Sequence, residues 1–332
     1  MARSKAAPFP PFVEPQLATL VSTAPEGDMW LHEMKFDGYR ILMRIEGDDV
    51  RLFTRRGNDW TGGMPSLAKA AAELPVEDAM FDGEVVALRS DGVSDFQLLQ
   101  NTLSSRGESK LVYYVFDVLF ADGEDLRALP LLERKARLAE ILKDADKQRF
   151  RLSDHVVGEG PAFFGKACEL GLEGIVSKLA DRPYRSGRNK DWLKTKCTKR
   201  QEFVIGGFTR PEGTRSHFGA LHLGARDEKS GDLVYVGKVG TGFSTKSLGE
   251  LHRRLEPLVV DEAPFRDPPG GAEAARSTWV KPVLVAEIDF TERTKDGMLR
   301  HPTFKGLRDD KVSAEVVVER PADRGRKKKR RS

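Results

Sequence analysis

Residues 33–40 read EMKFDGYR and continue an apolar, β-prone run that begins at Trp30. They place Lys35 at the end of a predicted strand, immediately before an Asp-Gly turn. A lysine ammonium is a poor nucleophile, but partial burial and neighbouring cations lower its pKa and expose a reactive amine. Lys35 is therefore a candidate nucleophile. The alternative is a surface hairpin with ordinary solvated charges, and a pattern as short as Lys-x-Asp-Gly favours that alternative when it stands alone.

Five further segments place charged or aromatic residues in or beside apolar strands. Charges are costly inside a core, so charges that recur on strands are expected to line a shared polar cavity. Lys194 and Lys196 alternate along a predicted strand and therefore project from one face. Two ammonium groups on one face repel each other unless an anion lies between them, and a triphosphate is the natural candidate. The five segments are residues 54–57 (TRRG), 81–84 (FDGE), 114–117 (YVFD), 171–178 (GLEGIVSK) and 192–196 (WLKTK).

The first part of the chain is predicted to be rich in strands. Short β-prone segments between residues 30 and 178 alternate with helices predicted at residues 67–74, 129–142 and 162–170. The helix at 129–142 carries apolar residues at helical spacing among alternating charges, which is typical of a surface helix.

The character of the chain changes after Arg200. Short strands separated by Gly-rich turns, with one helix near residues 244–255, suit a small β-barrel. Residues 261–276 are rich in Pro, Gly, Ala and acidic residues and are predicted to form a loop. The lysine- and arginine-dense residues 194–200 are the candidate hinge between two domains.

Composition limits the class of protein. A length of 332 residues suits two domains, and 39% hydrophobic residues are enough to bury their cores. No run of 18 apolar residues occurs, and prolines rather than an apolar segment follow residues 1–5, so we expect neither a membrane span nor a signal peptide. Cys168 and Cys197 are the only cysteines, so we expect neither a disulfide framework nor a four-ligand zinc site, and a reducing cytosol is the simplest location.

Basic charge is concentrated at the C-terminal end. The formal net charge is +4, and seven lysines and arginines between Arg324 and Arg331 contribute +7, so residues 1–323 carry −3. We expect residues 321–332 to form a disordered basic tail. A tail of this kind attracts polyanions non-specifically, and an interdomain linker is an equally good interpretation.

The lysine segment and the five segments after it resemble, in order and spacing, the signature motifs of the covalent nucleotidyltransferases, which are DNA ligases, RNA ligases and mRNA-capping enzymes. Two further stretches are similar to the ligase domain of bacterial ligase D, the enzyme of non-homologous end joining. The resemblance covers roughly residues 10–318. The first stretch spans residues 207–243 and contains GFTR, HFGAL and GKVGTGF, and the second is residues 300–311 (RHPTFKGLRDDK).

This resemblance implies an α+β fold in two domains. Residues 1–199 are expected to form a nucleotidyltransferase (adenylation) domain of antiparallel sheets with flanking helices. Residues 200–320 are expected to form a small OB-fold β-barrel, followed by the tail at 321–332.

The resemblance also implies an ATP-dependent DNA ligase that uses ATP as AMP donor together with Mg²⁺ or Mn²⁺. Lys35 is the expected catalytic nucleophile, and Glu84 and Glu173 are the expected metal contacts. Arg308, Asp310 and Lys311 match the last motif, which orients pyrophosphate in the family. The expected nucleotide-binding residues are Glu33, Arg40, Arg55, Glu84, Phe116, Lys178, Lys194, Lys196, Arg308, Asp310 and Lys311.

The expected partner is double-stranded DNA with nicks or ends, handled by a monomer with no membrane attachment in the bacterial cytoplasm, at the nucleoid. A Ku-type end-binding protein is a further expected partner. The alternatives are an RNA ligase, a capping-type nucleotidyltransferase, or a catalytically idle end-binding module. Ligases of the end-joining family often carry primase–polymerase and phosphoesterase domains, so the chain is either a stand-alone ligase or one piece of a larger protein.

Overall fold

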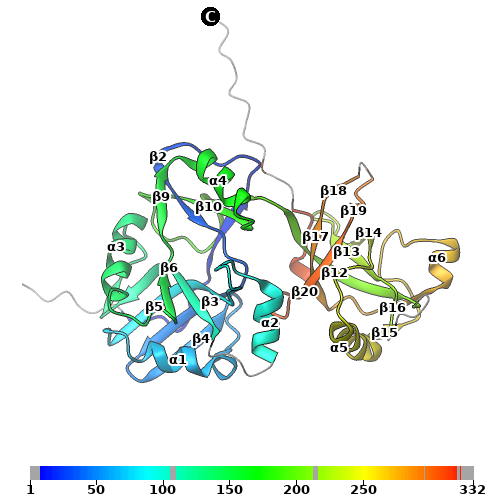
Figure 1. Ribbon diagram of the computed structural model, residues 1–332, viewed down its shortest axis with the longest axis horizontal. Helices are drawn as coiled ribbons and strands as arrows, with labels where there is room; N and C mark the ends of the chain where they lie inside the picture. Colours follow the sequence, from blue (N-terminus) through cyan, green and yellow to red (C-terminus); the bar gives the residue numbers. More distant parts are fainter. Residues whose placement is uncertain (1–7, 105–109, 212–215, 295, 320–321, 323–332) are drawn as a thin grey trace, which may run out of the picture. The chain divides into compact units, whose positions relative to one another are not determined.

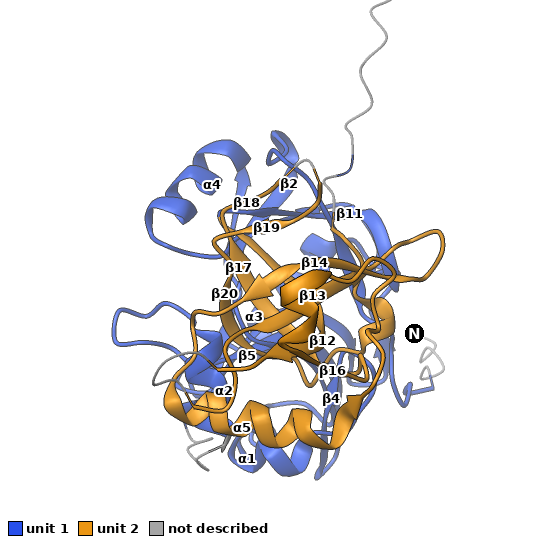
Figure 2. Cartoon of the chain, turned by 90° about the vertical axis from the view of Figure 1, so that its right-hand side faces the viewer, with its two compact units in different colours: residues 1–197, 320–332 blue, residues 198–319 orange. Residues whose placement is uncertain are grey.

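The structure, a computed structural model, describes residues 8–104, 110–211, 216–294, 296–319 and 322. The chain divides into two compact units, Met1–Cys197 with Arg320–Ser332, and Thr198–Glu319. Figure 1 labels most of the helices and strands, and Figure 2 colours the first unit blue and the second orange. The tail predicted to be disordered, residues 321–332, lies outside the described residues except for Ala322.

The larger sheet of unit 1 has the strand order β4-β3-β5-β6-β7, with β8 paired in parallel to β6. Ile41, Phe81 and Tyr113 project from one face into a core that includes residues of three helices, α1, α2 and α3. On the opposite face, Phe116 packs in a second cluster with Trp192 of the other sheet of this unit. The strands are β3 (Tyr39–Glu46), β4 (Asp49–Thr54), β5 (Asp78–Val86), β6 (Val112–Ala121), β7 (Glu124–Asp125) and β8 (Phe150–Leu152).

The second sheet of unit 1 has the order β1-β11-β10-β2-β9. Strand β1 runs parallel to β11, and the other pairs are antiparallel. Helix α4 (Gly160–Glu169) packs against it through Ala167, which contacts Ile175 and Ala24. The strands are β1 (Gln16–Leu20), β2 (Gly27–Met34), β9 (His155–Gly158), β10 (Gly174–Leu179) and β11 (Gly187–Lys196).

Unit 2 contains the five antiparallel strands expected of an OB-fold, in the order β14-β13-β12-β17-β20. Thr241, which follows β14, forms an isolated bridge with Thr303 of β20, but β14 and β20 form no ladder with each other in the described part of the chain, so strand pairing does not close the barrel there. The strands are β12 (Lys199–Thr209), β13 (Leu221–Arg226), β14 (Leu233–Val239), β15 (Val259–Val260), β16 (Ser277–Val280), β17 (Val285–Phe290), β18 (Glu292–Arg293), β19 (Leu299–Arg300) and β20 (Thr303–Leu307).

The helix predicted near residues 244–255 is present in unit 2 as α5 (Thr245–Leu255). Its three buried leucines, Leu248, Leu251 and Leu255, recur at helical intervals, and Ser244 caps the first turn by accepting from the Ser247 amide. A short helix, α6 (Gly271–Ala275), interrupts residues 261–276, so the prediction of a loop there was wrong for five residues.

One helix of unit 1 buries two cationic side chains that its sequence pattern did not predict to be buried. The predicted surface helix is α3 (Leu131–Ile141), but Arg134 and Lys135 on it are buried. The reason is that both cations have buried carboxylate partners on strands, which no helical periodicity reveals. The remaining helices are α1 (Pro65–Ala71) and α2 (Phe96–Ser104).

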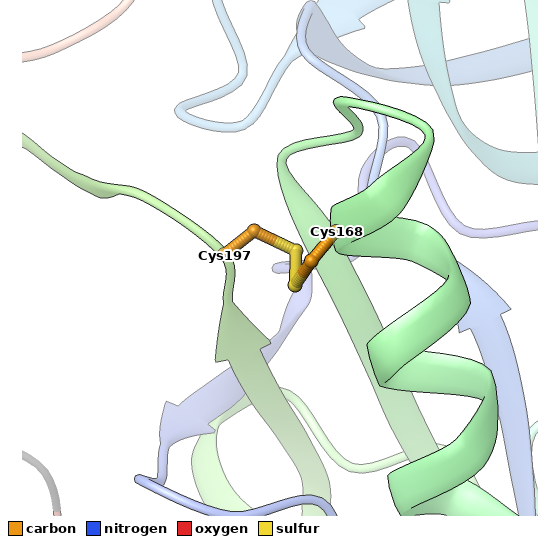
Figure 3. Close-up of a disulfide and its surroundings, with 2 residues drawn as sticks. All are labelled: Cys168 and Cys197. Carbon is orange, nitrogen blue, oxygen red and sulfur yellow. A yellow bond between two sulfur atoms is a disulfide. The ribbon is translucent and has the colours of Figure 1, made fainter.

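The two cysteines form a disulfide, although the sequence led us to expect no disulfide framework (Figure 3). Cys168 lies in the last turn of helix α4 and Cys197 follows β11, with Cα atoms 5.2 Å apart. The Cys197 amide also donates to the Glu173 carbonyl oxygen at 2.9 Å. The two cysteines are 29 residues apart in the sequence, so the sequence alone does not reveal that they are close. They are close because β10, which follows α4, pairs with β11. Among the described residues, no helix is long and apolar enough to cross a membrane.

Candidate active site

The strands β2, β10 and β11 bring the candidate residues of unit 1 to one face of the second sheet. Glu33 on β2 lies opposite Val176, and Val176 lies opposite Lys194. Two residues further along, Lys178 lies opposite Trp192. Residues that pair across strands, and residues two apart along a strand, project from the same face. The shared face predicted for Lys194 and Lys196 is therefore observed, and it also carries Glu33, Lys178 and Trp192.

Lys35 stands at the end of this face. It follows β2, and its amide donates to the Gly174 carbonyl oxygen at 2.9 Å, which continues the pairing with β10. Its Nζ lies 2.5 Å from Oε2 of Glu173. The Lys35 side chain is 23% exposed and that of Glu173 is 6% exposed, so the amine is reachable from solvent while its partner is covered. The carboxylate thus holds an accessible amine in a fixed direction.

The carboxylate of Glu33 is the centre of a buried polar cluster. It accepts from Lys135 (2.8 Å), from the Ser153 hydroxyl (2.7 Å) and from Lys178 (2.9 Å). Burial raises the pKa of Glu33, but the charges and hydrogen bonds of the two lysines outweigh burial and lower it. Glu33 is therefore held as an anion inside unit 1.

Lys178 connects this cluster to the aromatic residues between the sheets. Its Nζ lies 4.4 Å from the ring centroid of Phe116 and 4.2 Å from that of Trp192, both within cation–π range. Burial lowers the pKa of Lys178 to about 8; the charge of Glu33 opposes this shift and the charge of Lys135 adds to it. Lys178 is 2% exposed, so here it contacts the Phe116 ring rather than solvent.

Arg40 enters the same region from the larger sheet. Its guanidinium lies 4.9 Å from the Phe116 centroid and makes two hydrogen bonds to Asp82, of 2.8 and 2.6 Å. Asp82 also accepts from the Tyr184 hydroxyl at 2.6 Å. Burial lowers the pKa of Arg40, but the adjacent Asp82 more than compensates and raises it. Glu84 lies directly opposite Arg40 in the register of β3 and β5.

Arg55 immediately follows β4, the edge strand of the larger sheet. Phe36 follows Lys35 in the chain, and its ring stacks on that of Tyr114 on β6, with centroids 4.0 Å apart. This contact ties the loop after the candidate nucleophile to the strand that carries Phe116.

The candidate residues of unit 2 form a separate ionic cluster after β20. Arg308 donates twice to Asp310, both at 2.8 Å, and lies 3.3 Å from Glu287. Lys311 lies 3.2 Å from Glu202. Burial lowers the pKa of Arg308, but the charges of Asp310 and Glu287 outweigh burial and raise it. Arg308 is therefore tied to carboxylates of its own unit, and Lys311, 18% exposed, is the more accessible cation.

Glu84 and Glu173 carry carboxylate oxygens, the ligand type that Mg²⁺ prefers. The described residues contain no group of three or more His, Cys, Asp or Glu side chains placed to hold a metal. Mg²⁺ typically binds through one or two carboxylates together with substrate phosphates and water, so Glu84 and Glu173 with a bound triphosphate are sufficient.

Several residues of this site had no functional role predicted from the sequence: Lys135, Ser153, Asp82, Tyr184 and Trp192. Asp82 and Trp192 lie within segments predicted to line the polar cavity, so the sequence pattern already pointed to their positions. Lys135 and Ser153 lie far from those segments in the chain, and only the fold brings them to Glu33.

Two family models match the chain. Residues 15–196 match the ATP dependent DNA ligase domain, and residues 214–311 match the ATP dependent DNA ligase C terminal region. The chain is 44% identical over 317 residues to the multifunctional non-homologous end joining protein LigD of Pseudomonas aeruginosa, covering 95% of this chain and 38% of that protein. It is 38% identical over 308 residues to LigD of Mycolicibacterium smegmatis, covering 92% of this chain and 39% of that protein.

A solved structure of mycobacterial DNA ligase D complexed with ATP and MES superimposes with a TM-score of 0.68 at 35% identity. The superposition covers 91% of this chain and 97% of that one. The chain spans about two fifths of the length of the LigD relatives that it matches. Because the family models match residues of both units, the chain belongs to the ATP-dependent DNA ligase family.

Proposed function

We propose that this chain is an ATP-dependent DNA ligase that seals breaks with a 5′-phosphate and a 3′-hydroxyl through a covalent Lys35–AMP intermediate. The placement of Lys35 carries the proposal: an accessible amine is held 2.5 Å from Glu173, at the end of a sheet face that also bears Lys178, Lys194 and Lys196. Family membership and the ATP complex of the mycobacterial relative support ATP as the AMP donor.

In the first step, Nζ of Lys35 bonds to the α-phosphorus, the bond from that phosphorus to the bridging oxygen breaks, and pyrophosphate leaves. The amine attacks in its neutral form, so one proton must leave Nζ. Phosphoryl-type transfer depends mostly on positioning and charge neutralisation, which a row of lysines supplies. Lys194 and Lys196 are the proposed partners of the α-phosphate because they share the face of Lys35.

In the second step, an oxygen of the DNA 5′-phosphate attacks the phosphorus of Lys35–AMP and the lysine leaves, which produces a DNA-adenylate. In the third step, the 3′-hydroxyl attacks the 5′-phosphorus and AMP leaves. Lys178 is the proposed contact on the nucleotide rather than on the nick, because it is buried against Phe116.

The other nucleotide contacts are proposed from their positions. Phe116 stacks on the base and Glu33 accepts from its edge. Arg40, Arg55 and Glu84 hold the ribose and phosphate. Arg308, Asp310 and Lys311 orient pyrophosphate, with Lys311 as the contacting cation and the Arg308–Asp310 pair as its support.

Mg²⁺, or Mn²⁺ in its place, is the proposed cofactor. Bound through Glu84 and Glu173, it would neutralise charge on the phosphates. The carboxylate of Glu173 then has two contacts available to it, the amine of Lys35 and the metal ion.

The wider setting is proposed from the relatives. The LigD proteins are named for non-homologous end joining, which supports a role in double-strand-break repair on DNA ends or nicks. We further propose a monomer in the bacterial cytoplasm, at the nucleoid, assisted by a Ku-type end-binding protein.

The test is mass spectrometry of the purified protein. After removal of pre-bound AMP, incubation with ATP and Mg²⁺ should add one AMP to Lys35, located by peptide mapping, and Lys35→Ala should gain none. GTP should give no adduct, and nicked duplex DNA should then be sealed. If Lys35 gains no AMP, the proposal is wrong. If AMP is gained but only RNA ends are joined, the assignment of DNA as substrate is wrong.

A further inference from the structure

Lys135 is a buried cation on α3, outside the segments that resemble the family motifs. Its side chain is 3% exposed, and its Nζ donates to Oε1 of Glu33 and to the carbonyl oxygen of Ser153, both at 2.8 Å. A buried ammonium is costly unless it is paired and hydrogen-bonded. An apolar residue would fill this helix position at no such cost, so the contact with Glu33 is the feature that requires a lysine here.

The hydrogen-bond donors around Glu33 occupy most of the acceptor sites of its carboxylate. An ionised carboxylate has about four lone-pair sites. Three donors are in place: Lys135 on one oxygen, and Ser153 and Lys178 on the other. The cluster thus leaves about one acceptor site, and the direction of that site depends on where Lys135 holds the carboxylate.

The contact between Lys135 and Glu33 also affects the position of the candidate nucleophile, Lys35. Glu33 stands two residues before Lys35 and projects from the same side of the strand. The Lys35 amide bonds to Gly174 as the strand continues past Met34. An anchor on the Glu33 side chain therefore restrains the strand end that presents the Lys35 amine.

We propose that Lys135 is a positioning residue for nucleotidyl transfer, which holds the Glu33 carboxylate so that its remaining acceptor site faces the nucleobase beside the Lys178 donor. The inference rests on the proposed function, because it assigns this pocket to the base of ATP. An acceptor and a donor side by side near the Phe116 ring match adenine, whose amino group donates and whose neighbouring ring nitrogen accepts. Guanine presents the opposite pattern, an acceptor oxygen beside a ring N–H.

The charge of Lys135 also acts on Lys178. The charged groups around Lys178 are Glu33 on β2, Lys135 on α3 and Asp117 on β6, with Arg40 on β3 over the same aromatic rings. On β9, His155 faces Glu33 and both lysines. Burial lowers the pKa of Lys178 to about 8, and Lys135 adds to the lowering. Removal of the Lys135 charge should therefore raise the pKa of Lys178, so that it stays protonated and able to donate at higher pH.

The experiment compares ATP with purine riboside triphosphate, which lacks the 6-amino group. De-adenylylated full-length protein is reacted with each nucleotide across roughly pH 6–10, and nucleotidylated Lys35 is measured by mass spectrometry in single turnovers. Lys135→Met removes the donor and charge at similar length, and Lys135→Arg is the conservative variant. Arg137→Met is the matched control on the same helix, because Arg137 is 44% exposed and pairs with Asp122 at the surface.

For Lys135→Met, we expect kcat/KM with ATP to fall roughly 10- to 100-fold, as for loss of a hydrogen bond to a charged group. The loss with purine riboside triphosphate should be much smaller, and the alkaline decline of the ATP reaction should move to higher pH. Lys135→Arg should keep the wild-type pH profile, and Arg137→Met should match wild type throughout.

An equal loss with both nucleotides and an unshifted pH profile would overturn the inference, as would wild-type behaviour of Lys135→Met. If circular dichroism shows that Lys135→Met does not fold, Lys135→Gln undergoes the same comparison with the same deciding outcomes. Failure of the proposed function is a different result: wild-type protein would then form no Lys35 adduct with ATP at any pH.

Discussion

Nζ of Lys35 and Oε2 of Glu173 lie 2.5 Å apart although 138 positions separate them in the chain. Two backbone hydrogen bonds create this proximity, from Lys35 to Gly174 and from Cys197 to Glu173, both 2.9 Å long. The segment that carries the carboxylate is thus held between the end of β2 and the end of β11. The candidate nucleophile and its acidic partner are fixed by the sheet rather than by a mobile loop.

Replacing Glu173 with glutamine should therefore slow adenylylation of Lys35 while leaving the fold intact. The amide keeps the shape but loses the charge that orients the amine and that we propose as a ligand of the metal ion. We expect a roughly 10²- to 10³-fold lower single-turnover rate, the range seen when one electrostatic group of an active site is removed. Glu169→Gln is the control, because Glu169 is 68% exposed and pairs only with Lys166 among the ion pairs described. Equal rates for Glu173→Gln and wild type would contradict this role.

The buried pair of Arg134 and Asp117 should stabilise unit 1 strongly. Both side chains are 0% exposed and share hydrogen bonds of 2.7 and 2.8 Å. Arg134→Met would leave Asp117 as a buried charge without its partner, so we expect a loss of about 3–5 kcal/mol in the free energy of unfolding. Arg137→Met, which breaks an exposed pair on the same helix, should cost no more than about 1 kcal/mol. Urea denaturation measures both, and similar losses for the two variants would show that burial is not the cause.

Reduction of the Cys168–Cys197 disulfide should lower the stability of unit 1. The bond closes a loop with a sequence separation of 29 residues, for which the loss of chain entropy in the unfolded state predicts about 3–4 kcal/mol. Thermal melts with and without dithiothreitol should show a lower midpoint for unit 1, and a Cys168→Ser, Cys197→Ser double variant should show no response to the reductant. Alkylation of both thiols in protein that has never been reduced would mean that the disulfide is not formed.

Acidification should destabilise unit 2 through His222. This histidine is 0% exposed, and burial lowers its pKa from 6.5 to about 4. The unfolded chain binds the proton more readily, so the stability from neutral His222 is complete above pH 6.5 and is lost as pH falls toward 4. The full effect is about 3 kcal/mol. In thermal melts, the midpoint of His222→Gln should depend less on pH than that of the wild type. If the slope of the midpoint against pH between 6.5 and 4 is unchanged, other groups cause the pH dependence.

Local sequence patterns predicted many of the secondary-structure elements. β-Prone segments bounded by Gly- and Asp-containing breaks indicated many of the strands, and a helix was predicted near residues 244–255, where α5 lies. The order of the charged segments indicated the nucleotidyltransferase resemblance, which the family models then confirmed. The face shared by Lys194 and Lys196 also followed from alternation alone.

Pairings between distant residues were decided only by the tertiary structure. Lys135 and Arg134 belong to a helix with the pattern of a surface helix, yet they are buried because Glu33 and Asp117 reach them from strands of different sheets. Cys168 and Cys197 are joined because β10 and β11 pair. The sequence around a charged residue or a cysteine does not reveal which distant residue it pairs with. The free energy of such a pair depends on its burial and on the groups within a few ångströms, and both are set by the fold.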